Sequence, residues 1–326
     1  MGETSDVTEE RPAPRLSNHW PTVLFQIYLH MSALYGLFLV LTQASLLTTL
    51  YCILLVFFGT LGITLGCHRL WTHRTYAAAL PLRIFLALCQ TLTCQCSIFN
   101  WVINHKVHHK FHGTNNDPSN YKRGFFFCHL ASHCLEHNAE IERMKRHIPT
   151  TDLEEDYVVY YQHWLYYIIM PIIGILIPIN FAIDYLGESA LVAIFVIGFL
   201  RITLLLHASW LVESALLLWG LDPNDKKAGD TWLVFFVTKS LWPQYHYLLP
   251  WDYRSGEYGT YDSGCSTTIL RVFAALGLAS QLTTLSSKGV KKALALAADT
   301  GRPLEECLDE AKLILPDIIH QDADSY

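Results

Sequence analysis

The sequence has few charged residues. Asp, Glu, Lys and Arg make up 16% of the 326 residues, against about 25% in an average soluble protein. Apolar residues make up 52%, and the mean hydropathy is +0.25. Disordered chains have the opposite composition, so disorder is excluded. No run of Lys or Arg exceeds two residues and the net charge is −6, so we expect no nucleic acid among the partners.

The nine cysteines form no CxxC pair. That absence excludes zinc ribbons and thioredoxin-like redox motifs. The cysteines are scattered along the chain, and several lie in apolar stretches, so we expect reduced and mostly buried thiols.

Long uncharged stretches predict the fold. Residues 16–68 contain no Asp, Glu, Lys or Arg, and they exceed the roughly 20 residues that one transmembrane helix needs. Two spans fit there, at about 21–42 and about 47–66, and the stretch is too long for a signal peptide. Two further stretches predict spans at about 159–181 and about 189–212. The sequence therefore predicts an all-α membrane protein, with four transmembrane helices in two hairpins.

The positive charges predict the topology. Neither hairpin turn contains Lys or Arg, whereas residues 67–157 and 213–326 contain ten each. By the positive-inside rule, both termini and the middle segment are expected in the cytosol. We divide the chain into a polar tail at 1–20, one membrane domain at 21–300 and a polar tail at 301–326. The cytosolic segments of the domain are 67–158 and 213–300.

Residues 84–103 are also uncharged and could form a fifth span. The polar residues at 90–95 make contact with lipid unfavourable. We therefore expect a helix that lies at the interface or packs on the other helices. Farther along the chain, residues 288–298 predict a surface helix.

Histidines carry the clearest chemical signal, because five of the 16 fall in two clusters beside a predicted span. His105, His108 and His109 have offsets of three and four, which place them on one face of a helix. The offset of five between His68 and His73 separates them by about 140° on an α-helix. The two residues therefore either flank one site or bind two different ions. Imidazole sites without thiolates suit iron, copper or zinc. The isolated histidines are expected to be solvated or hydrogen-bonded.

Several segments together resemble one known family. They are GCHRLWTHRTY at 66–76, WVINHKVHHKF at 101–111, DPSNYKRGFFFCH at 117–129, WLVES at 210–214 and PWDYRSGEYG at 250–259. The chain resembles the membrane-bound acyl-CoA desaturases of the stearoyl-CoA, delta-9-like type, and in particular an insect-like member.

The resemblance implies a four-span, all-α membrane protein with a helical cytosolic cap. It also implies an oxidoreductase of unsaturated fatty acid synthesis in the endoplasmic reticulum membrane. The family introduces a double bond into a long-chain fatty acyl-CoA, using dioxygen and electrons from cytochrome b5 and its NADH-dependent reductase. Two irons, held by nine histidines and one asparagine, carry out the oxidation. Membrane lipid surrounds the protein.

The resemblance implies metal ligands at His68, His73, His105, His108, His109 and His246. The family asparagine is replaced by Glu213, which is a better metal ligand than asparagine. Three family histidines are replaced by Leu217, Pro243 and Tyr247, so the third histidine box is degenerate and the iron set is expected to be incomplete. His207 is a candidate replacement for the histidine missing at Leu217.

Two functions therefore remain open from the sequence. The first is an acyl-CoA desaturase with an altered metal set. The alternative is a catalytically weakened or inactive relative, which binds acyl lipid or pairs with an active desaturase.

Overall fold

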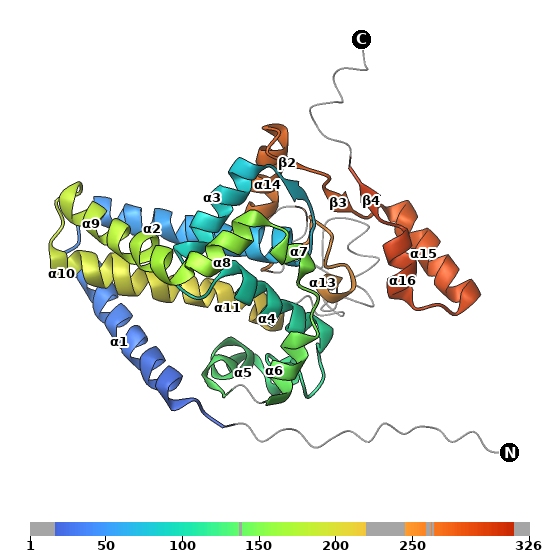
Figure 1. Ribbon diagram of the computed structural model, residues 1–326, viewed down its shortest axis with the longest axis horizontal. Helices are drawn as coiled ribbons and strands as arrows, with labels where there is room; N and C mark the ends of the chain where they lie inside the picture. The colour runs from blue at the N-terminus through green and yellow to red at the C-terminus, as the bar shows by residue number, and fades with distance from the viewer. Residues whose placement is uncertain (1–16, 137–138, 220–244, 259–261, 263, 316–326) are drawn as a thin grey trace, which may run out of the picture.

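The computed structural model describes residues 17–136, 139–219, 245–258, 262 and 264–315 (Figure 1). Within these residues, four helices are long and apolar enough to cross a membrane, and they are Trp20–Thr42, Leu46–Thr72, Tyr157–Asp184 and Ala190–Ala215. Only short two-residue strands accompany the helices. The predicted all-α, four-span architecture is confirmed.

Three of the four spans contain a π-helical segment. The first span is α1 (Trp20–Thr42), and the second joins α2 (Leu46–Leu61) to the π-helix η1 (Gly62–Thr72). The third consists of α8 (Tyr157–Ile169), η4 (Met170–Leu176) and α9 (Ile177–Asp184). The fourth consists of α10 (Ala190–Val192), η5 (Ala193–Leu200) and α11 (Arg201–Trp219).

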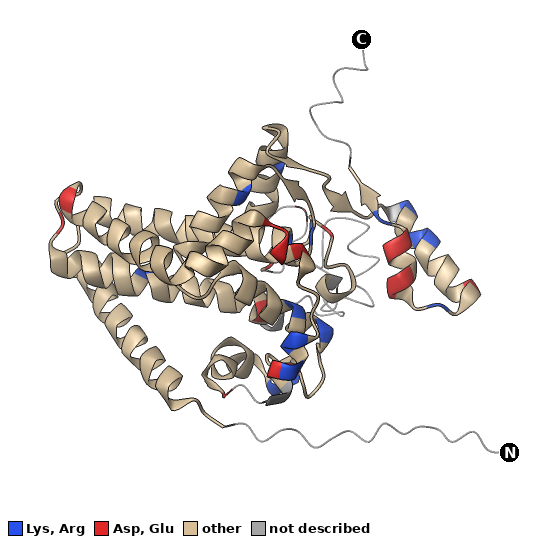
Figure 2. Cartoon of the chain, viewed as in Figure 1, with Lys and Arg blue, Asp and Glu red and all other residues tan. Residues whose placement is uncertain are grey.

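Both hairpin turns lie at the same end of the bundle. The Ser45 hydroxyl caps the start of α2, and the Ser45 backbone N–H donates to the Glu188 carboxylate in the other turn at 3.0 Å. Each turn is followed by the second or the fourth span. These two spans therefore end at the opposite end of the molecule. Figure 2 shows Lys and Arg gathered mostly away from the turns.

The stretch considered as a fifth span is broken into two helices. They are α3 (Leu80–Thr91) and α4 (Ile98–Lys110), and both pack on the spanning helices. The Gln162 side chain accepts from Ile98 N–H at 3.0 Å and donates to the Gln90 side chain at 2.8 Å. The polar residues that make this stretch unsuitable for lipid therefore pair inside the protein, which confirms the prediction that it packs on the other helices.

Arg201 is fully buried within the fourth span. Its guanidinium donates to the carbonyl oxygens of Ile197, Leu92 and Gly174. Leu92 begins the irregular link between α3 and α4, and backbone of this kind is tolerated at membrane depth only where protein groups satisfy it. Arg201 thus supplies a donor for the Leu92 carbonyl at the start of this link.

Smaller elements complete the end of the molecule that lies opposite the turns. They are η2 (Tyr121–Arg123), α5 (Phe125–His129), η3 (Ala131–Cys134), α6 (Ala139–Arg146), α7 (Thr151–Glu154), α13 (Tyr245–Leu248), α14 (Cys265–Ala275), α15 (Ser287–Thr300) and α16 (Leu304–Glu310). Strand β1 (Ala77–Ala78) pairs with β2 (Ala279–Ser280), and β3 (Thr283–Thr284) pairs with β4 (Leu313–Ile314). Helix α15 covers the surface helix predicted at 288–298.

Candidate metal centre

The first histidine pair lies at the end of the π-helix η1. The His73 backbone N–H donates to the His68 carbonyl at 3.0 Å, an i to i+5 bond that closes a wider turn than an α-helix has. The two rings therefore lie close together, with centroids 4.7 Å apart. The 140° separation expected for an α-helix is wrong, because this segment is not α-helical.

The second cluster lies on α4, as predicted, and it meets the first. The ring centroid of His73 lies 4.4 Å from that of His109, and the centroid of His68 lies 5.0 Å from that of His105. His108 lies at the edge of the group, 5.8 Å from His105. Two segments that are more than 30 residues apart thus converge on one centre.

Helix α13 brings His246 into the same centre. Its Nε2 atom lies 3.2 Å from Nε2 of His68 and 3.1 Å from Nε2 of His109. Each of His68, His73, His105 and His246 offers one nitrogen within 4.8 Å of the others, a spacing that could hold a metal ion. We call the five residues His68, His73, His105, His109 and His246 the imidazole half of the centre.

The imidazole half has the chemical state that metal binding requires. Burial lowers the pKa of His105 to about 4, and burial together with neighbouring imidazoles holds the pKa of His73, His109 and His246 well below the usual range. These rings are therefore neutral near pH 7, with lone pairs available for a metal. Both ring nitrogens of His105 and Nε2 of His73 are buried without a hydrogen-bond partner among the described residues. Buried polar atoms without partners fit a metal site.

The other side of the centre has mixed chemistry. Glu213 on α11 accepts a hydrogen bond from the Ser119 hydroxyl, and one of its oxygens lies 3.7 Å from Nδ1 of His105. The Tyr247 hydroxyl lies 3.0 Å from Nε2 of His108. We call His108, Glu213 and Tyr247 the mixed half of the centre. Leu217 lies near the end of α11, and Pro243 lies outside the described residues.

Two buried carboxylates that the sequence reasoning missed orient the histidines. Glu257 lies 3.1 Å from Nδ1 of His68 and is paired with the buried Arg69 guanidinium. Asp117 lies 2.7 Å from Nδ1 of His108. Such carboxylates fix the tautomer and direction of a ligating imidazole. The available signal was their position inside two family-like segments, DPSNYKRGFFFCH and PWDYRSGEYG.

His207 does not join the centre. Its Nε2 lies 3.1 Å from Nε2 of His30 on α1, and its Nδ1 lies 2.9 Å from Nε2 of His129 on α5. The hypothesis that His207 replaces the histidine missing at Leu217 is therefore not supported by its position. His30, His129 and His163 are hydrogen-bonded, as expected for isolated histidines, whereas His137 and His320 lie outside the described residues.

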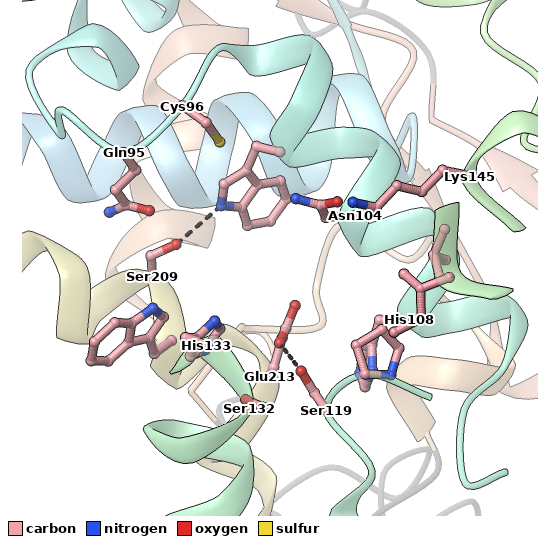
Figure 3. Close-up of a pocket in the computed structure, with 15 residues that line it drawn as sticks. Gln95, Cys96, Asn104, His108, Ser119, Ser132, His133, Lys145, Ser209 and Glu213 are labelled. Carbon is pink, nitrogen blue, oxygen red and sulfur yellow. Dashed lines mark hydrogen bonds between the residues drawn. The ribbon is translucent and has the colours of Figure 1, made fainter. Parts of the chain in front are cut away.

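A cavity of about 220 Å³ opens beside the mixed half. The indole rings of Trp101 and Trp210 are among its lining residues. His108 and Glu213 line it too, and both are labelled in Figure 3. The Trp101 indole N–H donates to the Ser209 hydroxyl at 3.0 Å, which fixes the ring at the wall. The cavity thus places the two indole rings beside candidate metal ligands, among other lining residues that are mostly polar.

The fold and the centre define a four-span helical membrane protein with an imidazole-rich site, which could hold a metal ion, at the ends of its second and fourth spans. No family model matches the chain. An acyl-CoA Delta-9 desaturase of Acheta domesticus is 38% identical over 283 residues, which cover 86% of this chain and 79% of the relative. An acyl-CoA Delta12-desaturase of the same species is 37% identical, covering 87% and 81%. The human stearoyl-CoA desaturase is 34% identical, covering 89% and 79%. The chain belongs to the acyl-CoA desaturase family.

Proposed function

We propose that the protein is an acyl-CoA desaturase that introduces a double bond into a long-chain fatty acyl-CoA. The observation that carries this proposal is the convergence of five imidazoles in a member of this family, four of which each offer a nitrogen within 4.8 Å of the others. These residues fit iron, because imidazole nitrogen is a ligand that suits this redox-active ion. Bound iron and dioxygen would supply an oxidant for an unactivated C–H bond.

The chain's own residues would hold the substrate at that centre. Trp101 and Trp210 provide apolar surface for a segment of the acyl chain, and Glu213 and His108 border the same cavity. Asp117 and Glu257 hold the imidazoles of His108 and His68 in fixed orientations. An acyl chain that fills this cavity would displace water from the reacting region, which would suppress side reactions of a strong oxidant.

The electron source and location are part of the same proposal. Cytochrome b5 and its NADH-dependent reductase would supply electrons, and the endoplasmic reticulum membrane would hold the protein. Both termini would lie in the cytosol. The gathering of Lys and Arg away from the hairpin turns supports this orientation by the positive-inside rule (Figure 2).

A second candidate function is a weakened relative that binds acyl lipid or pairs with an active desaturase. The observation that favours it is the mixed half, where a phenol and a carboxylate stand at positions that match an imidazole and an amide in the family resemblance. Hard oxygen ligands change the affinity and redox behaviour of an ion.

Complementation of a desaturase-deficient yeast separates the two functions. The wild-type chain should restore unsaturated fatty acids, at a rate below that of an ordinary family member. His246→Ala should restore none, because His246 contacts both His68 and His109. His147→Ala, at an exposed ring whose Nδ1 bonds the Arg143 carbonyl of the preceding helix, is the matched control and should behave as wild type. If the wild-type chain does not restore unsaturated fatty acids but still binds acyl lipid, the second function is supported.

A further inference from the structure

Helix α13 presents two consecutive side chains to the two halves of the centre. His246 points its Nε2 atom to within 3.2 Å of His68 and 3.1 Å of His109. Tyr247 instead places its hydroxyl 3.0 Å from Nε2 of His108. One short helix therefore contributes a potential ligand to each half.

The His108 ring is held in the orientation of a metal ligand. Because the Asp117 carboxylate accepts a hydrogen bond from Nδ1 at 2.7 Å, the other ring nitrogen, Nε2, faces Tyr247. Asp117 is itself held by the backbone N–H groups of Ser119 at 2.9 Å and Gly113 at 3.2 Å. A carboxylate fixed in this way is the usual support behind a ligating histidine.

The spacing between Tyr247 and His108 matches that of two ligands on one ion. Ligand atoms about 2.1 Å from a metal and at right angles to each other lie about 3.0 Å apart. The same separation recurs between the histidine nitrogens of the imidazole half, at 3.1 and 3.2 Å. The contact is therefore compatible with a shared ion as well as with a hydrogen bond.

Glu213 completes the surroundings of that position. It borders the same cavity as His108, and Figure 3 shows both side chains directed into this space. One of its oxygens also lies 3.7 Å from Nδ1 of His105, a nitrogen with no hydrogen-bond partner among the described residues. An imidazole, a phenol and a carboxylate form a hard, oxygen-rich ligand set that favours ferric iron.

We propose that Tyr247 is a phenolate ligand of a second iron ion, which it holds together with His108 and Glu213. This proposal rests on the iron-dependent function proposed above. On binding, the phenol O–H bond breaks, an oxygen–metal bond forms, and the proton passes to solvent, as metal binding to protonated ligands requires. Tyrosinate is an established iron ligand in other proteins.

The test is spectroscopic and uses the full-length purified chain. The protein is loaded with ferrous iron without oxygen and then oxidised with ferricyanide, which takes one electron from each iron. A phenolate on ferric iron gives a visible charge-transfer band and tyrosinate modes in resonance Raman spectra. We expect both signals and about two irons per chain in the wild type.

Variants assign the signal to one residue. Tyr247→Phe should lose the band and fall to about one iron per chain, because the imidazole half stays intact. Tyr247→His should keep about two irons without the band. Tyr121→Phe is the matched control, since Tyr121 stacks on His112, as Tyr247 does, and it should keep both signals.

The outcomes separate this proposal from the proposed function. One iron per wild-type chain without a band overturns the Tyr247 assignment and leaves a histidine-held iron in place. Two irons without a band, or a band that persists in Tyr247→Phe, also overturns it. A folded wild-type chain that binds no iron overturns both proposals. The single iron retained by Tyr247→Phe shows that this variant is folded.

Discussion

The two halves of the centre differ in their ligands but resemble each other in their support. The imidazole half contains five histidines from η1, α4 and α13, and Glu257 orients His68 behind it. The mixed half combines an imidazole, a phenol and a carboxylate, and Asp117 orients His108 behind it. The candidate ligand atoms therefore differ between the two halves, while each half has a supporting carboxylate. Support of this kind is more typical of a site that still binds metal than of an abandoned one.

The largest expected effect comes from the support of the imidazole half. Glu257→Ala leaves the Arg69 guanidinium buried without its carboxylate, and loss of one partner of a buried pair costs about 3–5 kcal/mol. We expect a large fall in melting temperature and loss of iron from the imidazole half. Glu310→Ala, which removes an exposed partner of Arg302, should leave both unchanged. Equal melting temperatures of Glu257→Ala and Glu310→Ala would show that the Arg69–Glu257 pair does not stabilise this half.

A smaller effect is expected from the support of the mixed half. Asp117→Asn weakens the hold on Nδ1 of His108, and loss of such a carboxylate lowers metal affinity about 10–100-fold. Iron titration should show weaker binding of the second ion and unchanged binding of the first. Asp152→Asn, at a carboxylate that pairs with Lys106, is the control. Weakening of the first ion by Asp117→Asn would mean that the two halves are not separate sites.

Restoring the family ligand set tests whether the mixed half limits the reaction. Leu217→His, Pro243→His, Tyr247→His and Glu213→Asn together should raise desaturation in yeast by about tenfold, equivalent to about 1.4 kcal/mol of barrier. Single replacements should do little, because ligands of one site act as a unit. Wild-type activity already equal to that of an ordinary family member would show that the mixed half is fully competent.

Much of the fold followed from sequence because its signals are local. Uncharged stretches predicted the four spans, and the polar residues at 90–95 correctly indicated that no fifth helix crosses the membrane there. The π-helical form of η1 could not be predicted, because it depends on how 62–72 packs against α3 and α4. That form decides the relation between His68 and His73, so the α-helical geometry assumed for them was wrong.

The candidate site was predictable only at positions where the residue matches a histidine of the family motifs. The histidines that match the family's histidine motifs lie close together in the structure. His207 matches no such motif and was a candidate only because it precedes Leu217, where the family histidine is missing. It bonds His30 and His129 instead. Glu257 and Asp117 were missed because nothing local distinguishes a buried carboxylate from a solvated one. Their role depends on contacts 189 and nine residues away in the chain.

The smallest expected effect concerns the cavity, which borders the mixed half through His108 and Glu213. Ser209→Ala removes the acceptor of the Trp101 indole N–H, and leaving a buried donor unsatisfied costs about 1–3 kcal/mol. Part of that cost is recovered if water enters the cavity, so we expect the low end of this range in thermal unfolding. Because Trp101 then has more freedom at the wall, affinity for a long-chain acyl-CoA should fall by a few fold, measured by equilibrium binding.

Thr60→Ala, whose hydroxyl bonds the Val56 carbonyl of its own helix, is the control. Both iron affinities should be unchanged. A change in the second iron alone would show that the cavity wall and the mixed half act as one unit, and unchanged acyl-CoA affinity would mean that the acyl chain lies elsewhere.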